Sequence, residues 1–171
     1  MNEKEIFHVI YNAAHNNAID LLKESKILFE AKHYPRSYFL ALTALEELSK
    51  SQMAADVYTS YIKADKFYKH YSKHNKKLNR IEWAHSDAIE FAYYLRDKYG
   101  EQIEIKKPSI KKRMQSLYVD IGENESLQTP NNTINKQDAE EMIHIVMVAL
   151  QQIITRTEYY GHQIGTKGFM K

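Results

Sequence analysis

Glu46, Glu47 and Lys50 are three charged residues in an otherwise apolar stretch, residues 41–50. Glu46 and Lys50 are one helical turn apart. One interpretation is an exposed ion pair, worth about 0.2–0.5 kcal/mol on a helix surface. The other is a partly enclosed polar cluster, because the apolar neighbours leave these charges little free surface. Such a cluster needs partners from other helices, or a ligand, to offset its desolvation.

A second group of residues with possible chemistry follows the first and consists of His70, His74, Lys77, Arg80 and His85. His70 and His74 have the one-turn spacing of a two-histidine metal site, but spacing identifies no third ligand. We therefore expect no metal and no cofactor. Arg80 and His85 form an Arg-x4-His pair, which on a helix could bind a phosphate and move a proton from a ribose hydroxyl. A second Arg–His pair occurs at Arg156 and His162, and chance spacing is the alternative for both.

Two segments combine basic residues in ways that could hold phosphates. In the first, aromatic and basic residues are interleaved: Tyr61, Lys63, Lys66, Phe67, Tyr68, Lys69, Tyr71 and Lys73. The alternative here is a half-buried helix with a solvated lysine face. The second straddles Pro108 and contains Lys106, Lys107, Lys111, Lys112 and Arg113. A solvated run of charge competes with a phosphate-contacting strip in this segment.

Composition excludes several classes of protein. The chain has 171 residues, no cysteine and a formal net charge of +2, which suits a single domain over residues 1–171 without disulfides, thiolate metal sites or a thiol nucleophile. It contains no glycine-rich phosphate loop and no nucleophile elbow, which excludes kinase-like and esterase-like enzymes. No stretch approaches the roughly 20 apolar residues of a membrane span. We expect a cytoplasmic protein with no membrane partner.

The elements that must position these residues are helices. Glycine and proline are scarce, and apolar residues recur at three- and four-residue spacing, which predicts an all-α fold. Four long helices are expected, at about residues 3–31, 35–57, 78–99 and 135–160, the second being the most enclosed. The other predicted segments are a short helix and turn over 58–77, a short helical or extended piece over 110–119, a polar surface loop over 123–135 and a loose tail over 161–171. Together they predict a four-helix bundle with extra short elements between its third and fourth helices.

Three segments carry a resemblance to a known family. They are residues 31–50, with the pattern Glu46-Glu47-x-x-Lys50; residues 74–78, a turn rich in histidine and lysine; and residues 113–120, followed by the polar loop and Ala139. In this order they resemble the AbiV-type abortive-infection proteins of the HEPN superfamily, over most of the chain. The resemblance implies an all-helical HEPN bundle, usually dimeric, and a role in bacterial defence against phage.

The resemblance also bears on catalysis. Many HEPN proteins are metal-independent RNases that use an Arg-x4-6-His motif near the start of the last bundle helix. Here Arg80 to His85 begins the third predicted helix and Arg156 to His162 closes the fourth, so the chain departs from that pattern. If the protein cleaves RNA, we expect catalysis to take place in a cleft formed by Glu46, Glu47, Lys50, His74 and Arg113. Secondary candidates are Lys77, Arg80, His85 and Tyr118.

Within this expected cleft, Glu47 or His74 would move protons, and Lys50 and Arg113 would hold phosphate. The leading hypothesis is therefore a homodimeric abortive-infection effector that acts on RNA, as a metal-independent endoribonuclease, or on the translation apparatus. The competing hypothesis is a non-catalytic helical module that docks a phage or host protein, with the same charges forming a structural network. A structural helical protein without defence activity fits the bundle equally well.

Overall fold

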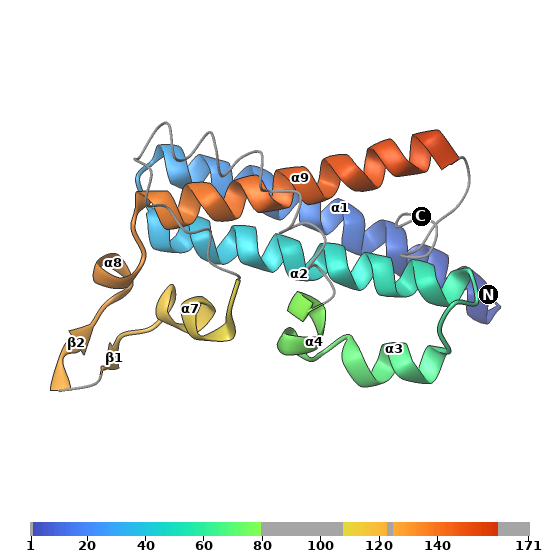
Figure 1. Ribbon diagram of the computed structural model, residues 1–171, viewed down its shortest axis with the longest axis horizontal. Coiled ribbons are helices and arrows are strands. Elements are labelled where there is room, and N and C mark those ends of the chain that lie inside the picture. The colour runs from blue at the N-terminus through green and yellow to red at the C-terminus, as the bar shows by residue number, and fades with distance from the viewer. Residues whose placement is uncertain (1, 80–107, 123–124, 161–171) are drawn as a thin grey trace.

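Three long helices lie side by side and form the body of the molecule (Figure 1). They are α1 (Glu3–Glu30), α2 (Tyr34–Tyr58) and α9 (Lys136–Tyr160). The computed structural model describes residues 2–79, 108–122 and 125–160, and their side chains except those of residues 79 and 152–160. Helices α1 and α2 run antiparallel, and α9 packs along both. The first, second and fourth predicted helices are therefore confirmed.

The ends of these helices follow from local sequence. Asn2 and Glu5 form a capping box, in which Asn2 Oδ1 accepts from Glu5 N at 2.9 Å. Pro35 occupies the first turn of α2, where its missing N–H costs nothing. Asn135 directly precedes α9, and its Oδ1 accepts from the backbone N of Asp138 at 2.9 Å. The predicted helix boundaries are thus set by side-chain caps and by proline.

The main core lies where α2 packs between α1 and α9. Helix α2 is buried over most of its length, as its apolar centre predicted. On α9, buried apolar residues recur at three- and four-residue spacing, at Ala139, Met142, Val146 and Ala149. In α1 Leu22 is buried, whereas the neighbouring Leu21 is only partly buried. A second cluster, at the other end of α2, contains Phe7, Met53, Ala54, Val57 and Phe67.

Shorter elements lie along one side of α2 (Figure 1). They are α3 (Ala64–His70), α4 (His74–Asn79) and α7 (Ile110–Gln115). The predicted short helix and turn over 58–77 is therefore two short helices. The third long helix, predicted over 78–99, lies outside the described residues apart from residues 78–79, which belong to α4. The predicted tail, residues 161–171, lies outside them as well.

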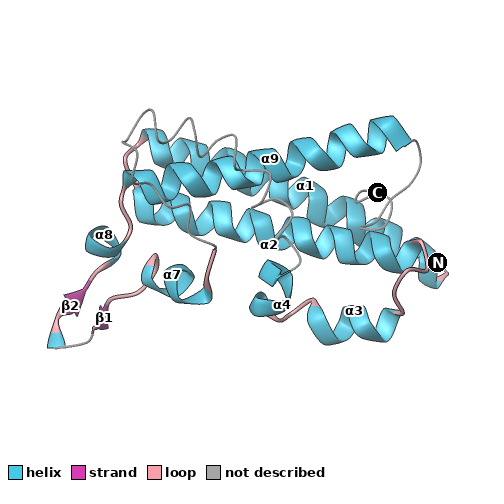
Figure 2. Cartoon of the chain, viewed as in Figure 1, coloured by secondary structure: helices cyan, strands magenta, loops and turns pink. Residues whose placement is uncertain are grey.

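Between α7 and α9 the structure contains more order than the polar composition predicted. Strands β1 (Asp120–Ile121) and β2 (Leu127–Gln128) form an antiparallel pair, and α8 (Pro130–Thr133) follows. Thr129 and Asn132 form a capping box that closes this single helical turn. Figure 2 shows that helices dominate the described part of the chain and that the sheet is a small appendage. No described helix has both the length and the apolar character needed to cross a membrane.

Candidate active site

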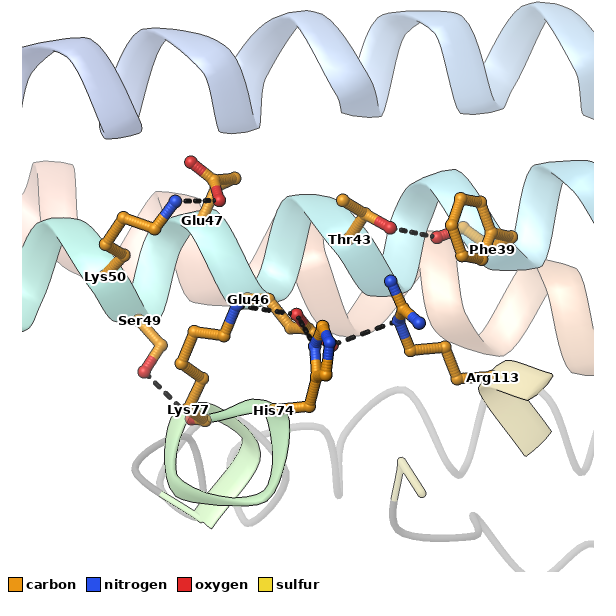
Figure 3. A network of polar contacts seen from close by, with 9 residues as sticks. All are labelled: Phe39, Thr43, Glu46, Glu47, Ser49, Lys50, His74, Lys77 and Arg113. Carbon is orange, nitrogen blue, oxygen red and sulfur yellow. Dashed lines mark hydrogen bonds and ion pairs between the residues drawn. The ribbon is translucent and has the colours of Figure 1, made fainter. Parts of the chain in front are cut away.

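Glu46 lies on the side of α2 that faces α4 and α7, and its side chain is only 2% exposed. Three basic side chains surround its carboxylate (Figure 3). His74 Nδ1 lies 2.6 Å from Oε2 and Lys77 Nζ lies 2.9 Å from the same oxygen. Arg113 Nε lies 3.3 Å from Oε1. We call these four residues the Glu46 cluster.

Helix α4 supplies two members of the cluster. His74 and Lys77 are three residues apart and so project from the same face of the helix. That face is fastened to α2 by a buried hydrogen bond, in which Ser49 Oγ donates to the backbone oxygen of Lys77 at 2.8 Å. Ser49 follows Glu46 by three residues, so the two lie on the same face of α2. This face contacts both the backbone of α4, through Ser49, and the side chains of α4, through Glu46.

Helix α7 supplies the fourth member. The guanidinium of Arg113 lies over the Phe39 ring, 4.9 Å from its centroid, and this contact and the Glu46 contact fix its position on α2. The preceding residue, Lys112, forms an ion pair with Asp138 of α9. Ser109 caps α7 by accepting from Lys112 N at 3.2 Å. This short helix is therefore anchored to both α2 and α9.

The cluster has an excess of positive charge and one accessible member. One carboxylate faces two permanent cations and an imidazole, so the formal sum is at least +1. The Lys77 and Arg113 side chains are 7% and 17% exposed, whereas that of His74 is 43% exposed. Arg113 Nε and Glu46 Oε1 are close but do not form a hydrogen bond, and neither atom has another hydrogen-bond partner among the described residues. The cluster thus presents an imidazole to solvent over a buried, neutralised carboxylate.

The structure brings together only part of the predicted cleft. Glu46, His74 and Arg113 converge. Glu47 and Lys50 instead pair with each other, with side chains 14% and 24% exposed. Figure 3 shows this pair on the other side of α2 from His74. Lys50 is thus paired with Glu47 rather than with Glu46, because neighbouring helical positions point in different directions.

The secondary candidates fall in different places. Lys77 belongs to the Glu46 cluster. Tyr118 is 57% exposed and lines a separate cavity of about 670 Å³ between α7 and the small sheet. Arg80 and His85 lie outside the described residues, as do the side chain of Arg156 and all of His162. Neither Arg–His pair is therefore placed relative to the cluster.

Sequence reasoning missed the residues that support the cluster. Phe39, Lys112 and Asp138 hold Arg113 and α7 in place, and no spacing rule connects residues so far apart in sequence. Lys77, by contrast, was named from the sequence as a secondary candidate, and it lies three residues after His74. Among the described residues, no group of three or more histidines, cysteines or carboxylates is arranged to hold a metal ion.

The fold defines the class of protein: an all-α, HEPN-like helical bundle. A family model described as AbiV, of the HEPN type, matches residues 7–151. The chain therefore belongs to the AbiV family of HEPN proteins, as its sequence resemblance predicted. Membership of this family indicates a role in abortive infection, a form of bacterial defence against phage. Comparison with curated proteins found no match, and neither did comparison with solved structures.

Proposed function

We propose that this protein is an abortive-infection effector that cleaves RNA without a metal ion, with the Glu46 cluster as its reactive centre. The observation that carries the proposal is the 2.6 Å contact between Glu46 Oε2 and His74 Nδ1. A buried carboxylate that accepts from one ring nitrogen fixes the tautomer and orientation of the imidazole, as in enzymes with a histidine general base. The other ring nitrogen, Nε2, has no partner among the described residues.

The proposed reaction needs only a proton acceptor and charge stabilisation. His74 Nε2 takes the proton of a ribose 2′-hydroxyl, and the 2′-oxygen forms a bond to the adjacent phosphorus. The bond from phosphorus to the 5′-oxygen breaks, that oxygen takes a proton from water, and the imidazolium of His74 returns its proton to solvent. The products are a 2′,3′-cyclic phosphate and a 5′-hydroxyl. Glu46 acts as a positioning residue and stabilises the imidazolium that forms.

The two permanent cations have different proposed roles because their exposure differs. Lys77 is almost buried and contacts Glu46 directly, so it offsets the charge of that carboxylate. Arg113 is more exposed, and its planar guanidinium suits a phosphate that gains charge in the transition state. Removing such a contact typically lowers kcat by about 10²- to 10³-fold.

The test is incubation of the purified protein with single-stranded RNA in excess chelator, followed by analysis of the new ends. The proposal predicts 2′,3′-cyclic phosphate ends. It also predicts that Glu46→Gln, if folded, loses most activity. Ends that carry a 5′-phosphate, or cleavage that stops in chelator, would show a different mechanism.

We also propose that the protein acts as a cytoplasmic homodimer, since HEPN domains commonly dimerise. Sedimentation equilibrium of the full chain tests the oligomeric state. A mass near twice 20.1 kDa is expected.

A second candidate function, docking of a phage or host protein, is favoured by apolar side chains around α7 and the small sheet. Tyr118, Val119, Ile121 and Leu127 are 57–71% exposed, and exposed apolar patches often mark interaction sites. Protection from phage that survives His74→Gln but is lost in Ile121→Glu would favour this function. Protection that is lost in His74→Gln but survives in Ile121→Glu would favour RNA cleavage.

A further inference from the structure

Positive charge is concentrated in the segment that leads to His74. Residues 61–79 contain six lysines and a single acidic residue, Asp65, whereas the net charge of the whole chain is only +2. The rest of the chain is therefore net acidic. One of the six, Lys77, belongs to the Glu46 cluster. The other five are exposed: Lys63, Lys66, Lys69, Lys73 and Lys76. We call these five lysines, with Tyr68 and Tyr71, the basic strip.

Within the part of the chain that the structure describes, the charges of the basic strip are not neutralised. None of its five ammonium groups forms an ion pair with a carboxylate of the described residues. Their combined field acts on His70, in the middle of the strip. Desolvation lowers the pKa of His70, and the charges of Lys76, Lys66, Lys69 and Lys73 lower it further. An anion with several negative charges would be attracted to the same place.

Aromatic rings are fixed among these lysines. The buried Phe67 stacks on Tyr71, with centroids 5.4 Å apart and planes 2° apart, and meets Tyr68 edge-on at 5.6 Å. Phe67 is itself held by Phe7 of α1, at 5.1 Å. Tyr68 and Tyr71 are nevertheless 54% and 41% exposed. Rigid, exposed rings beside lysines are what nucleic-acid-binding surfaces use to stack bases and hold the backbone.

The strip includes residues on both sides of the proposed reactive centre. Lys73 is followed directly by His74, the first residue of α4. Helix α3 has seven residues and is roughly 10 Å long, which is about three nucleotides at the 3.4 Å spacing of a stacked strand. A strand held on α3 would therefore need to extend only a little further to bring a ribose to His74.

We propose that the basic strip binds single-stranded RNA and leads it to His74. This inference rests on the proposed function and names the surface that holds its substrate. Single-stranded RNA fits better than an acidic protein or an anionic membrane, because the exposed rings can stack on unpaired bases.

The first test measures binding of a fluorescein-labelled single-stranded RNA by fluorescence anisotropy, in chelator and in a His74→Gln background that prevents turnover. The triple variant Lys66→Gln, Lys69→Gln, Lys73→Gln should bind at least tenfold more weakly. The slope of log K against log salt concentration should be smaller in magnitude by about 2 in this variant. Each of the three lost phosphate contacts contributes roughly 0.7 to that slope. The matched control removes three exposed lysines of the α1 region: Lys23→Gln, Lys26→Gln, Lys32→Gln. It should bind within twofold of the parent.

Two further variants separate stacking and charge from damage to the fold. Tyr68→Leu keeps the apolar contact but loses the ring and should weaken binding by about tenfold. Replacing the same three strip lysines by arginine should preserve binding. Thermal unfolding followed by circular dichroism checks that each variant is folded.

Equal weakening by both lysine-to-glutamine triples would overturn the inference. So would binding of polyglutamate or of phosphatidylserine vesicles as tightly as RNA, since that would indicate an interaction with any polyanion. Strip-dependent RNA binding without cleavage would uphold the inference and contradict the proposed function. Cleavage that depends on His74 but is unchanged in the lysine-to-glutamine triple of the strip would uphold the proposed function and contradict the inference.

Discussion

The Nδ1 atom of His74 lies 2.6 Å from Oε2 of Glu46, a residue 28 positions earlier in the chain. The carboxylate is almost wholly buried, whereas the imidazole is partly open to solvent. The contact therefore connects the interior of the bundle to its surface. The carboxylate orients the ring through Nδ1 and leaves Nε2 for a substrate.

Loss of the Glu46 charge should destabilise the protein strongly. Glu46→Gln leaves Lys77 and Arg113 largely buried without a counter-charge, and breaking a buried ion pair on one side typically costs about 3–5 kcal/mol. Urea unfolding measures the change. Glu47→Gln is the control, since it breaks the less buried pair with Lys50 and should cost about 1 kcal/mol or less. Similar losses in the two variants would mean that the Glu46 cluster is not enclosed as described.

The bond between Ser49 and Lys77 should hold α4 against α2. Ser49→Ala removes the only side-chain donor described for the Lys77 carbonyl, with an expected loss of about 1 kcal/mol. Hydrogen exchange should become faster in α4 while α9 is unchanged. Faster exchange throughout the molecule would indicate a global effect instead.

Two serines should couple α1 to α2. Ser25 Oγ donates to Ser37 O at 2.8 Å, Ser37 Oγ donates to Ser25 O at 2.9 Å, and both side chains are fully buried. Each single change to alanine leaves the other hydroxyl with fewer buried partners and should cost about 1–3 kcal/mol. Because replacing both partners removes that penalty, the double variant should cost less than the sum of the singles. Additive losses in urea unfolding would contradict this coupling.

Acid should destabilise the fold in part through His144. Burial lowers the pKa of His144 from 6.5 to about 4, although the nearby Glu140 acts in the opposite direction. As the pH falls from about 6.5 to about 4, the unfolded chain takes up a proton here that the folded chain does not, so stability decreases with falling pH. His144→Gln should have a flatter stability curve in this window, measured by urea unfolding at several pH values. Parallel curves for the two proteins would exclude this contribution.

The long helices could be predicted because their information is local. Periodic apolar residues, Pro35 and the Asn135 cap define α2 and the start of α9 within a few positions. The small sheet and α8 could not be predicted, since a two-residue strand carries no periodic pattern and depends on its partner.

The site could be predicted only in part for a related reason. Glu46 was recognisable as a charge in an apolar helix, and His74 and Arg113 as reactive residue types. That these three meet, while Glu47 and Lys50 turn away, depends on how α4 and α7 pack against α2. Packing of short helices is a tertiary property that residue spacing does not encode.

The most direct test of the central claim compares RNA cleavage by two histidine variants in chelator. His74→Gln removes the proposed proton acceptor, whereas His33→Gln changes an exposed histidine before α2. We predict that cleavage falls at least 100-fold in His74→Gln, within the range for loss of a general base, and is unchanged in His33→Gln. Cleavage by His74→Gln at the rate of the unaltered protein would contradict the account.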